Sequence, residues 1–304
     1  MRWAAAVVGL ALATLLALLA RDPLGTPPAA LEPPEANALV RLEFELRPAL
    51  PVKDLVLAIA LPDDLPGRQT VVKLHATHPM REVRTARGNR IGRFVLPEVA
   101  ERTTVTVEVE MRVRPFDLAS RPAAAPLAAV ERVRALAPEA EIEADHPEIV
   151  ALAEGIEGER LAWIEAALAR VHDRVRYGGY VFERPGALAT LRGGEGDCSD
   201  QTDLLVALCR AGGVPARHAY GLELRGRTTN RHSWAEIAHP DGGWFPVDPL
   251  NVRLGTASFD ALPADRVLLM GTALDDELAP YWYYRYDSRE GALEIVFRPT
   301  LRIR

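Results

Sequence analysis

Cysteine is scarce in this chain, because its 304 residues include only Cys198 and Cys209. A disulfide-built scaffold and a Cys-rich zinc site both need more thiols, so both are excluded. A positive charge excess is also lacking, since 36 Lys and Arg stand against 42 Asp and Glu for a net charge of −6. Nucleic-acid binding depends on clustered cations, so no nucleic-acid partner is expected. Calcium-loop and phosphate-loop spacings are lacking too, so we predict no metal and no nucleotide or other cofactor.

The N-terminus carries an unbroken apolar run from Trp3 to Ala20. As a helix this run would span about 27 Å, just under the ~30 Å core of a bilayer. It exceeds the usual apolar region of a signal peptide, and no Ala-x-Ala site ends it. We therefore predict an uncleaved membrane anchor over residues 1–22, with a cleaved signal segment as the alternative. In both cases the body lies outside the cytoplasmic membrane, and a cleaved protein would be secreted or periplasmic.

A strand-rich region follows a proline-rich spacer at residues 23–36, which cannot form a helix. Apolar and polar residues alternate strictly over residues 38–46 and 105–113, as in half-buried strands. Less regular strand candidates between them are residues 55–61, 70–74 and 91–96. This pattern predicts a β-sandwich over residues 37–118, without a catalytic constellation. A Pro/Ala-rich linker over residues 119–145 separates it from the remainder.

Helical patterns begin the second domain, which we place at residues 146–304. Helices are predicted near residues 147–154 and 159–175, where apolar residues recur at helical spacing on one face of the second. Residues 281–284 form an aromatic cluster, Tyr-Trp-Tyr-Tyr, that could line the floor of a binding groove or pack against the core. We favour packing.

The Gly-rich loop at residues 193–196 leads into a nearly all-apolar helix. Asp197 is a natural N-cap, and Asp200 three residues on completes an approximate capping box. Cys198 then sits in the first turn, where the partial positive charge of the helix N-terminus stabilises a thiolate. Asp197, Asp200 and Asp203 oppose this effect, so a cationic partner is needed.

Cys209 lies eleven residues further along the same helix, roughly 16 Å away by the rise per residue. A disulfide requires Cα atoms about 4.4–6.8 Å apart. The two thiols therefore cannot pair within one helix, and Cys209 is interpreted as a small buried apolar residue.

A hairpin downstream supplies the cationic partner. Strand-like residues 231–237 and 244–249 flank a Gly-containing turn, which places His232 and Asp248 opposite each other to within a residue or two. An aspartate beside an imidazole holds its tautomer, and the imidazole can activate a thiol. Cys198, His232 and Asp248 thus form a candidate cysteine-nucleophile triad, although each residue taken singly has a structural explanation.

The stretches that carry this chemistry resemble the bacterial transglutaminase-like family, a branch of the papain-like cysteine enzymes. They are Gly194 to Asp200, Leu204-Leu205-Val206-Ala207-Leu208-Cys209-Arg210-Ala211-Gly212-Gly213-Val214-Pro215-Ala216-Arg217, His232-Ser233-Trp234-Ala235-Glu236, and Gly243-Trp244-Phe245-Pro246-Val247-Asp248-Pro249. The similarity covers about residues 148–252. It differs at Ser233, where Ala is common, and after Pro249, where Thr often follows.

This resemblance implies an α+β fold in which the N-terminal β-sandwich precedes a core with a central helix packed on an antiparallel sheet. It also implies that Cys198 is the acylated nucleophile, His232 the general base and acid, and Asp248 the residue that orients the histidine. The oxyanion would be stabilised by the Cys198 backbone N–H and an upstream side chain, for which Tyr177 is the candidate.

The expected function is thiol-dependent acyl transfer on amide bonds of a protein or peptide substrate, with a cell-envelope component as one candidate. Hydrolysis of peptide or isopeptide bonds is slightly favoured over transglutamination, because water needs no dedicated acceptor site. The alternative is a catalytically silent module that uses the same cleft to bind peptides or cell-wall material.

Overall fold

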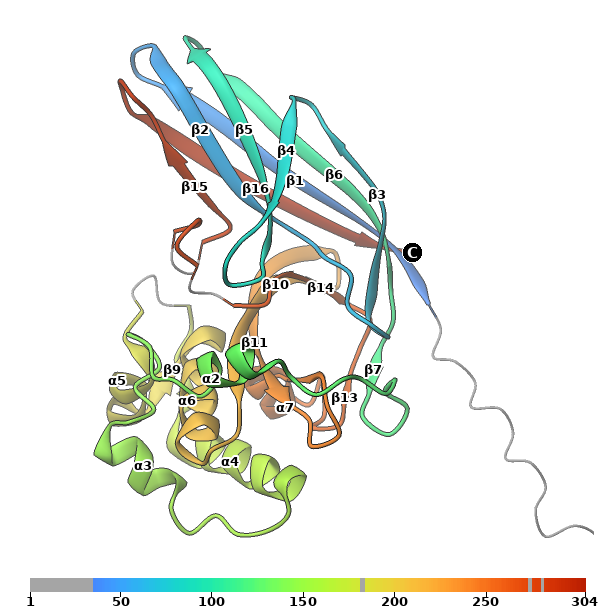
Figure 1. Ribbon diagram of the computed structural model, residues 1–304, viewed down its shortest axis with the longest axis vertical. Helices are drawn as coiled ribbons and strands as arrows, with labels where there is room; N and C mark the ends of the chain where they lie inside the picture. Colours follow the sequence, from blue (N-terminus) through green and yellow to red (C-terminus); the bar gives the residue numbers. More distant parts are fainter. Residues whose placement is uncertain (1–34, 181–183, 273–274, 280–281) are drawn as a thin grey trace, which may run out of the picture. The chain divides into compact units, whose positions relative to one another are not determined.

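The computed structural model describes residues 35–180, 184–272, 275–279 and 282–304 (Figure 1). The predicted membrane anchor at residues 1–22 and most of the predicted spacer lie outside the described residues. None of the helices in these ranges combines the length and the apolar character that a membrane crossing requires. The described residues belong to one compact unit, which covers residues 34–304.

Two four-stranded antiparallel sheets form the first layered part of this unit (Figure 1). The first has the order β16 (Leu293–Ile303), β1 (Ala36–Pro48), β6 (Thr103–Val113), β3 (Gln69–Ala76), and the second β15 (Tyr284–Asp287), β2 (Val52–Leu61), β5 (Arg90–Val99), β4 (Met80–Arg84). The alternating positions Val40, Leu42, Phe44 and Leu46 are fully buried in a core that both sheets share. The predicted strands are therefore confirmed, and their apolar faces build a β-sandwich.

The C-terminal strands complete this sandwich rather than the catalytic core. Strand β16 pairs with β1 along its length, with Ala38 opposite Ile303, and β15 pairs with β2, with Tyr284 opposite Ile59. Both strands lie within residues 146–304, which the sequence pattern predicts to form the second domain. An alternating pattern shows that a strand exists, but it does not say which distant edge the strand joins.

The remaining elements build the helix-and-sheet core predicted from the family resemblance. Its antiparallel sheet has the order β12 (Trp244–Val247), β11 (Thr228–Ala238), β10 (Ala216–Arg225), β14 (Arg266–Met270). The helices are α2 (Ala129–Arg134), α3 (Pro147–Ala153), α4 (Arg160–Arg174), α5 (Gly186–Gly193), α6 (Cys198–Ala211) and α7 (Pro249–Leu254). Two short pairs, β7 (Phe116–Asp117) with β13 (Ala261–Leu262) and β8 (Arg176–Tyr177) with β9 (Glu195–Gly196), complete the α+β fold.

Helix α6 is the central helix of this core, and its residues 199–210 are all buried. Ala216, Ala235 and Ile237 of the sheet share its apolar cluster, so one face of the sheet packs on α6. On the opposite face, Glu236 accepts a hydrogen bond from Arg68, and Trp234 packs near Leu65. The segment before β3 of the sandwich therefore covers the face of the sheet that points away from α6.

Candidate active site

The start of α6 is shaped by the capping pattern read in the sequence. The Asp197 carboxylate accepts hydrogen bonds from the backbone N–H groups of Ser199 at 2.7 Å and Asp200 at 3.2 Å, and the Asp200 carboxylate accepts from the Asp197 N–H at 2.9 Å. A Cβ atom on Gly196 would lie 2.6 Å from the Asp200 Cβ, so this approach requires glycine. Cys198 is thereby fixed as the first residue of a buried helix, with its thiol partly exposed.

The hairpin brings the other two candidate residues to this helix start. Strand β11 carries His232, and Asp248 follows β12 as the N-cap of α7. The antiparallel pairing places Ala235 opposite Val247, which leaves His232 and Asp248 two residues out of direct register. This offset agrees with the spacing argument made from the sequence.

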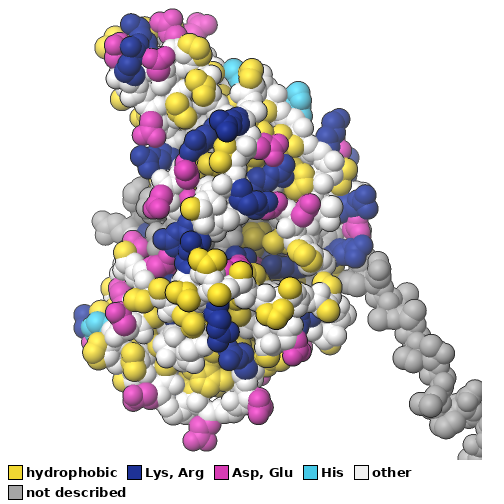
Figure 2. Space-filling view, in the orientation of Figure 1, with side chains coloured by type: hydrophobic (Ala, Val, Ile, Leu, Met, Phe, Trp, Pro, Cys, Tyr) yellow, Lys and Arg dark blue, Asp and Glu magenta, His cyan; other side chains and the backbone are white. Residues whose placement is uncertain are grey.

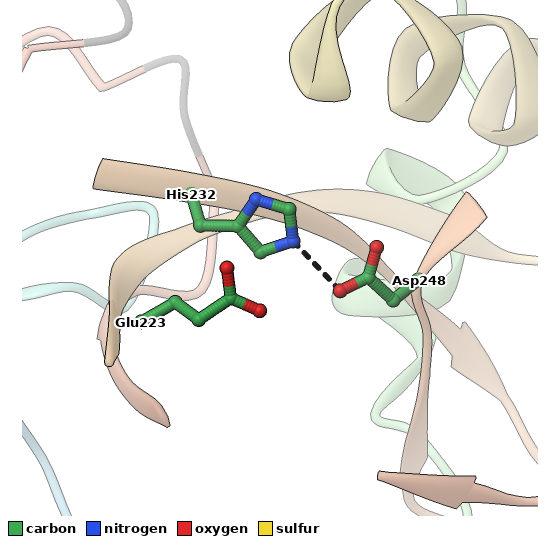
Figure 3. Close-up of side chains that lie close together, drawn as sticks. All are labelled: Glu223, His232 and Asp248. Carbon is green, nitrogen blue, oxygen red and sulfur yellow. Dashed lines mark hydrogen bonds and ion pairs between the residues drawn. The ribbon is translucent and has the colours of Figure 1, made fainter. Parts of the chain in front are cut away.

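A hydrogen bond of 2.7 Å joins His232 Nε2 to Asp248 Oδ2 (Figure 3). Because a carboxylate can only accept, Nε2 carries the proton and Nδ1 is the ring nitrogen available to the thiol. The Cys198 thiol lies near enough to this histidine to contribute to the raised pKa of its ring. His232 and Asp248 are both buried, with 3% and 0% of their side chains exposed.

The electrostatics of this pair favour a protonated imidazole. Burial disfavours the charged ring, but the attraction and hydrogen bond of Asp248, with a smaller contribution from Cys198, raise the pKa of His232 to about 10. The same contact holds the pKa of Asp248 well below its usual value, against the opposing effect of burial. The thiol therefore has the cationic partner that the sequence analysis required.

Residues that the sequence analysis did not identify hold Asp248 in place. Oxygen Oδ2 also accepts from Arg266 Nη1 at 2.6 Å and from Asn251 Nδ2 at 2.9 Å. Arg266 in turn donates to Glu223 Oε1 at 3.1 Å, and Asn251 donates to the same oxygen. Asn251 could have been found from its position three residues after the N-cap, but no sequence signal connects Arg266 or Glu223 to the site.

Glu223, His232 and Asp248 present their potential metal-binding atoms within 4.8 Å of one another (Figure 3). Both carboxylates already face the Arg266 guanidinium, and the second oxygen of Glu223 accepts from Arg225 Nε at 2.5 Å. These arginines already neutralise both carboxylates that would serve as ligands. The cluster is built as a charge-balanced network that orients His232 rather than as a metal centre.

The acidic residues near Cys198 oppose a thiolate less than their number suggests. Asp203 is fully buried and lies 2.6 Å from both Arg184 and His218, which lower its pKa despite its burial. Burial and the neighbouring Asp197 raise the pKa of Asp200 to about 6. The charge of Asp203 is thus compensated by partners that only the fold supplies, and the charge of Asp200 is lost below about pH 6.

A cavity of about 480 Å³ opens at Cys198 and His232, and its walls include Tyr177, Tyr180 and Tyr220. Tyr177 reaches it because β8 pairs with β9 and sets Tyr177 opposite Gly196, and half of its side chain is exposed. The candidate oxyanion residue therefore lines the same cavity as the thiol.

The aromatic cluster near the C-terminus supports this wall. Tyr283 is fully buried and stacks on Tyr220 with a ring separation of 4.6 Å, whereas Tyr281 lies outside the described residues. The packing role predicted for the cluster therefore applies to Tyr283.

Cys209 is fully buried in the apolar cluster around α6. Burial raises the pKa of its thiol to about 12, so it stays protonated at neutral pH. The prediction that Cys209 is a core residue is confirmed.

A comparison with known protein families shows which family the helix-and-sheet core is similar to. Residues 150–249 match the family described as the transglutaminase-like superfamily. The chain contains a transglutaminase-like domain. By sequence, no curated protein matches the chain.

Among solved structures, a candidate cysteine protease from Cytophaga hutchinsonii superposes with a TM-score of 0.61 at 16% identity, covering 89% of this chain and 91% of the other. At this identity the match shows the fold alone, and it includes both the sandwich and the transglutaminase-like domain. The periplasmic domain of TgpA from Pseudomonas aeruginosa gives a TM-score of 0.37 at 18% identity, over 71% of this chain and 89% of that one.

Proposed function

We propose that the protein catalyses thiol-dependent acyl transfer on amide bonds, with Cys198 as the nucleophile, His232 as the general base and acid, and Asp248 as the residue that orients the histidine. The observation that carries this proposal is the position of His232. Its ring hydrogen-bonds to Asp248 through Nε2 and lines the same cavity as the partly exposed Cys198 at the start of a buried helix. This is the geometry required of an activated cysteine.

The reaction would begin from the form in which the thiol proton is already held on Nδ1 of His232, as an imidazolium beside the Cys198 thiolate. The thiolate attacks the amide carbonyl, and the imidazolium then gives its proton to the leaving amine, which departs and leaves a thioester on Cys198. In the second half, His232 takes a proton from water or from an acceptor amine as that nucleophile attacks the thioester. The thioester carbon then expels the Cys198 thiolate, which restores the thiolate beside the imidazolium and releases the product acid or amide.

The oxyanion that forms in both halves would be stabilised at the start of α6. The cap uses the N–H groups of Ser199 and Asp200, so the Cys198 N–H at the first helical position remains for the substrate. Tyr177 would donate from its hydroxyl group across the cavity. Its replacement by Phe tests this role, because a lost donor lowers kcat more than it changes KM.

Hydrolysis of peptide or isopeptide bonds is the favoured reaction, and transfer to an amine is the second. The open cavity admits water without a dedicated acceptor site. The substrate would be a protein or peptide outside the cytoplasmic membrane, since the apolar run from Trp3 to Ala20 would anchor or export the chain. A fluorescent amine offered with a glutamine-containing protein distinguishes the two reactions, because only transfer makes the protein fluorescent.

Alkylation of the thiol separates an enzyme from a silent binding module. We expect iodoacetamide at pH 7 to modify Cys198 at least tenfold faster than free N-acetylcysteine, while buried Cys209 stays unmodified in the same mass spectrum. His232→Ala should remove this advantage, and His75→Ala, which changes an exposed histidine of the sandwich, should not. A Cys198 that reacts no faster than the free thiol would favour the binding module.

A further inference from the structure

A second cavity, of about 430 Å³, lies on the sandwich side of the catalytic sheet. Arg217 of β10 and Trp244 of β12 line it from the sheet, Arg68 and Leu65 from the sandwich, and Arg121 from the linker. Ligand pockets in proteins have about this size. No candidate catalytic residue contributes to its walls.

The walls of this cavity are rich in arginine. Six arginines line it, Arg68, Arg84, Arg87, Arg90, Arg121 and Arg217, against the two carboxylates of Asp63 and Glu131. In the space-filling view, Lys and Arg side chains gather together with apolar ones across the middle of the visible face (Figure 2). Four of the six have a carboxylate oxygen 2.5–2.7 Å from a guanidinium nitrogen, in the pairs Arg68–Glu236, Arg84–Asp63, Arg87–Glu139 and Arg90–Glu82.

The remaining two, Arg121 and Arg217, lack such a partner in the described part of the chain. The closest carboxylate oxygen to Arg121 belongs to Asp241, at 3.9 Å, and the Asp241 side chain is 83% exposed. Arg121 otherwise donates to the Gly242 carbonyl and to a ring nitrogen of His239. Because only 12% of its side chain is exposed, its charge is largely removed from water without a close counter-charge.

Within the described ranges, Arg217 is compensated only by Glu131 and, at longer range, by Glu236, which is itself paired with Arg68. Its closest carboxylate oxygen, on Glu131, is 3.4 Å away and also accepts a 2.9 Å hydrogen bond from Trp244 Nε1. The buried Arg217 Nε has no acceptor among the described residues, and burial lowers the pKa of this guanidinium. The guanidinium stacks over the Trp244 ring at 4.2 Å, which fixes it at the cavity wall.

Buried cations that lack close counter-charges bind anions strongly, because the desolvation cost has already been met by the fold. The apolar side chains of Trp244, Leu65 and Leu127 line the same space. We propose that this cavity binds a small organic anion, in which a carboxylate or phosphate is held by Arg121 and Arg217 and a planar or apolar group packs beside Trp244.

Phenyl phosphate is a suitable probe, because it combines a phosphate with a planar apolar ring. We expect it to bind the full chain saturably in calorimetry and to change the tryptophan fluorescence, whereas neutral benzyl alcohol should do neither. Inorganic phosphate should bind more weakly than phenyl phosphate. Arg217→Met and Arg121→Met should each weaken phenyl phosphate binding about tenfold or more, as expected when a charge-assisted hydrogen bond is lost.

Three control variants make this test decisive. Arg217→Lys keeps the charge and should retain most of the binding, which separates charge from a general loss of fold. Arg285→Met removes an exposed arginine of β15 and should change nothing. Arg231→Met alters the cavity at Cys198 and should also leave binding intact. The proposal is overturned if the intact chain does not bind phenyl phosphate, or if Arg217→Met and Arg121→Met bind it as tightly as the intact chain does. It is also overturned if, of these variants, only Arg231→Met abolishes binding.

Discussion

Replacing Asp248 by Asn tests the electrostatic core of the proposed site. The carboxylate lies 2.7 Å from His232 Nε2 and 2.6 Å from Arg266 Nη1. Burial disfavours the charged imidazole, yet Asp248, and to a smaller extent Cys198, raise the pKa of His232 from 6.5 to about 10. At about 1.4 kcal/mol per pH unit, this difference corresponds to at most about 5 kcal/mol of preference for the imidazolium. We therefore expect Asp248→Asn to lower the free energy of unfolding by about 3–5 kcal/mol near pH 6.

The loss should depend on pH with a definite sign. The pKa of folded His232 is raised, so its contribution is fully present below pH 6.5 and is lost as the pH rises to about 10. The pKa of Asp248 is lowered, so its contribution is present above its usual value of 3.8 and is lost as the pH falls through the folded value. The difference between the intact chain and Asp248→Asn should thus be largest near pH 4–6.5 and should narrow toward pH 10.

Urea denaturation at pH 5.5, 7, 8.5 and 9.5 measures this difference directly. Asp287→Asn is the matched control, because its side chain is 69% exposed and should change stability by less than about 0.5 kcal/mol. In a Cys198→Ala background, NMR titration of labelled histidines should show His232 protonated well above pH 7, and adding Asp248→Asn should bring its pKa to 6.5 or lower. A stability difference that is equal at pH 5.5 and pH 9.5, or a His232 that titrates near 6.5 with Asp248 intact, would refute the reasoning.

Two further substitutions probe the packing around the site. Gly221→Ala would push a Cβ into the Val267 carbonyl, so we expect the free energy of unfolding to fall by about 3 kcal/mol or more. The control, Gly193→Ala, lies in an open position at the end of α5 and should be neutral or raise the free energy of unfolding by up to about 1 kcal/mol. Thermal unfolding of both variants measures these changes. Arg266→Met leaves two buried carboxylates without their shared cation, so we expect the free energy of unfolding in urea to fall by about 3–5 kcal/mol. The control, Arg285→Met, changes an exposed arginine and should lower it by less than about 0.5 kcal/mol. Equal losses in the two variants would contradict the role of Arg266.

The local features of the site could be predicted from the sequence because neighbouring residues determine them. The capping box at Asp197 and Asp200 depends on a spacing of three residues, and the hairpin that aligns His232 with Asp248 depends on one turn. Both the capping box and the hairpin could be predicted without knowing where any other element lies.

The supporting network could not be predicted, because its members meet only through tertiary contacts. Arg266 reaches Asp248 from β14, and Glu223 reaches Arg266 from β10, strands whose neighbours are set by the register of the sheet. Arg184 compensates Asp203 through a similar long-range contact. The sequence therefore indicated which residues could react, but not what compensates their charges.

The pairing of β1 with β16 has a consequence for how the protein is made. Ala38 lies opposite Ile303, and the Asn37 N–H donates to the Arg304 carbonyl at 3.0 Å. Ribosomes add roughly 5–20 residues per second, so β1 waits on the order of 10–50 s for this neighbour, with one edge open to other chains. The whole transglutaminase-like domain is synthesised during that interval. We expect proteases to cut the sandwich in nascent chains that end before β16. The sandwich should become resistant to proteases only once β16 has emerged from the ribosome.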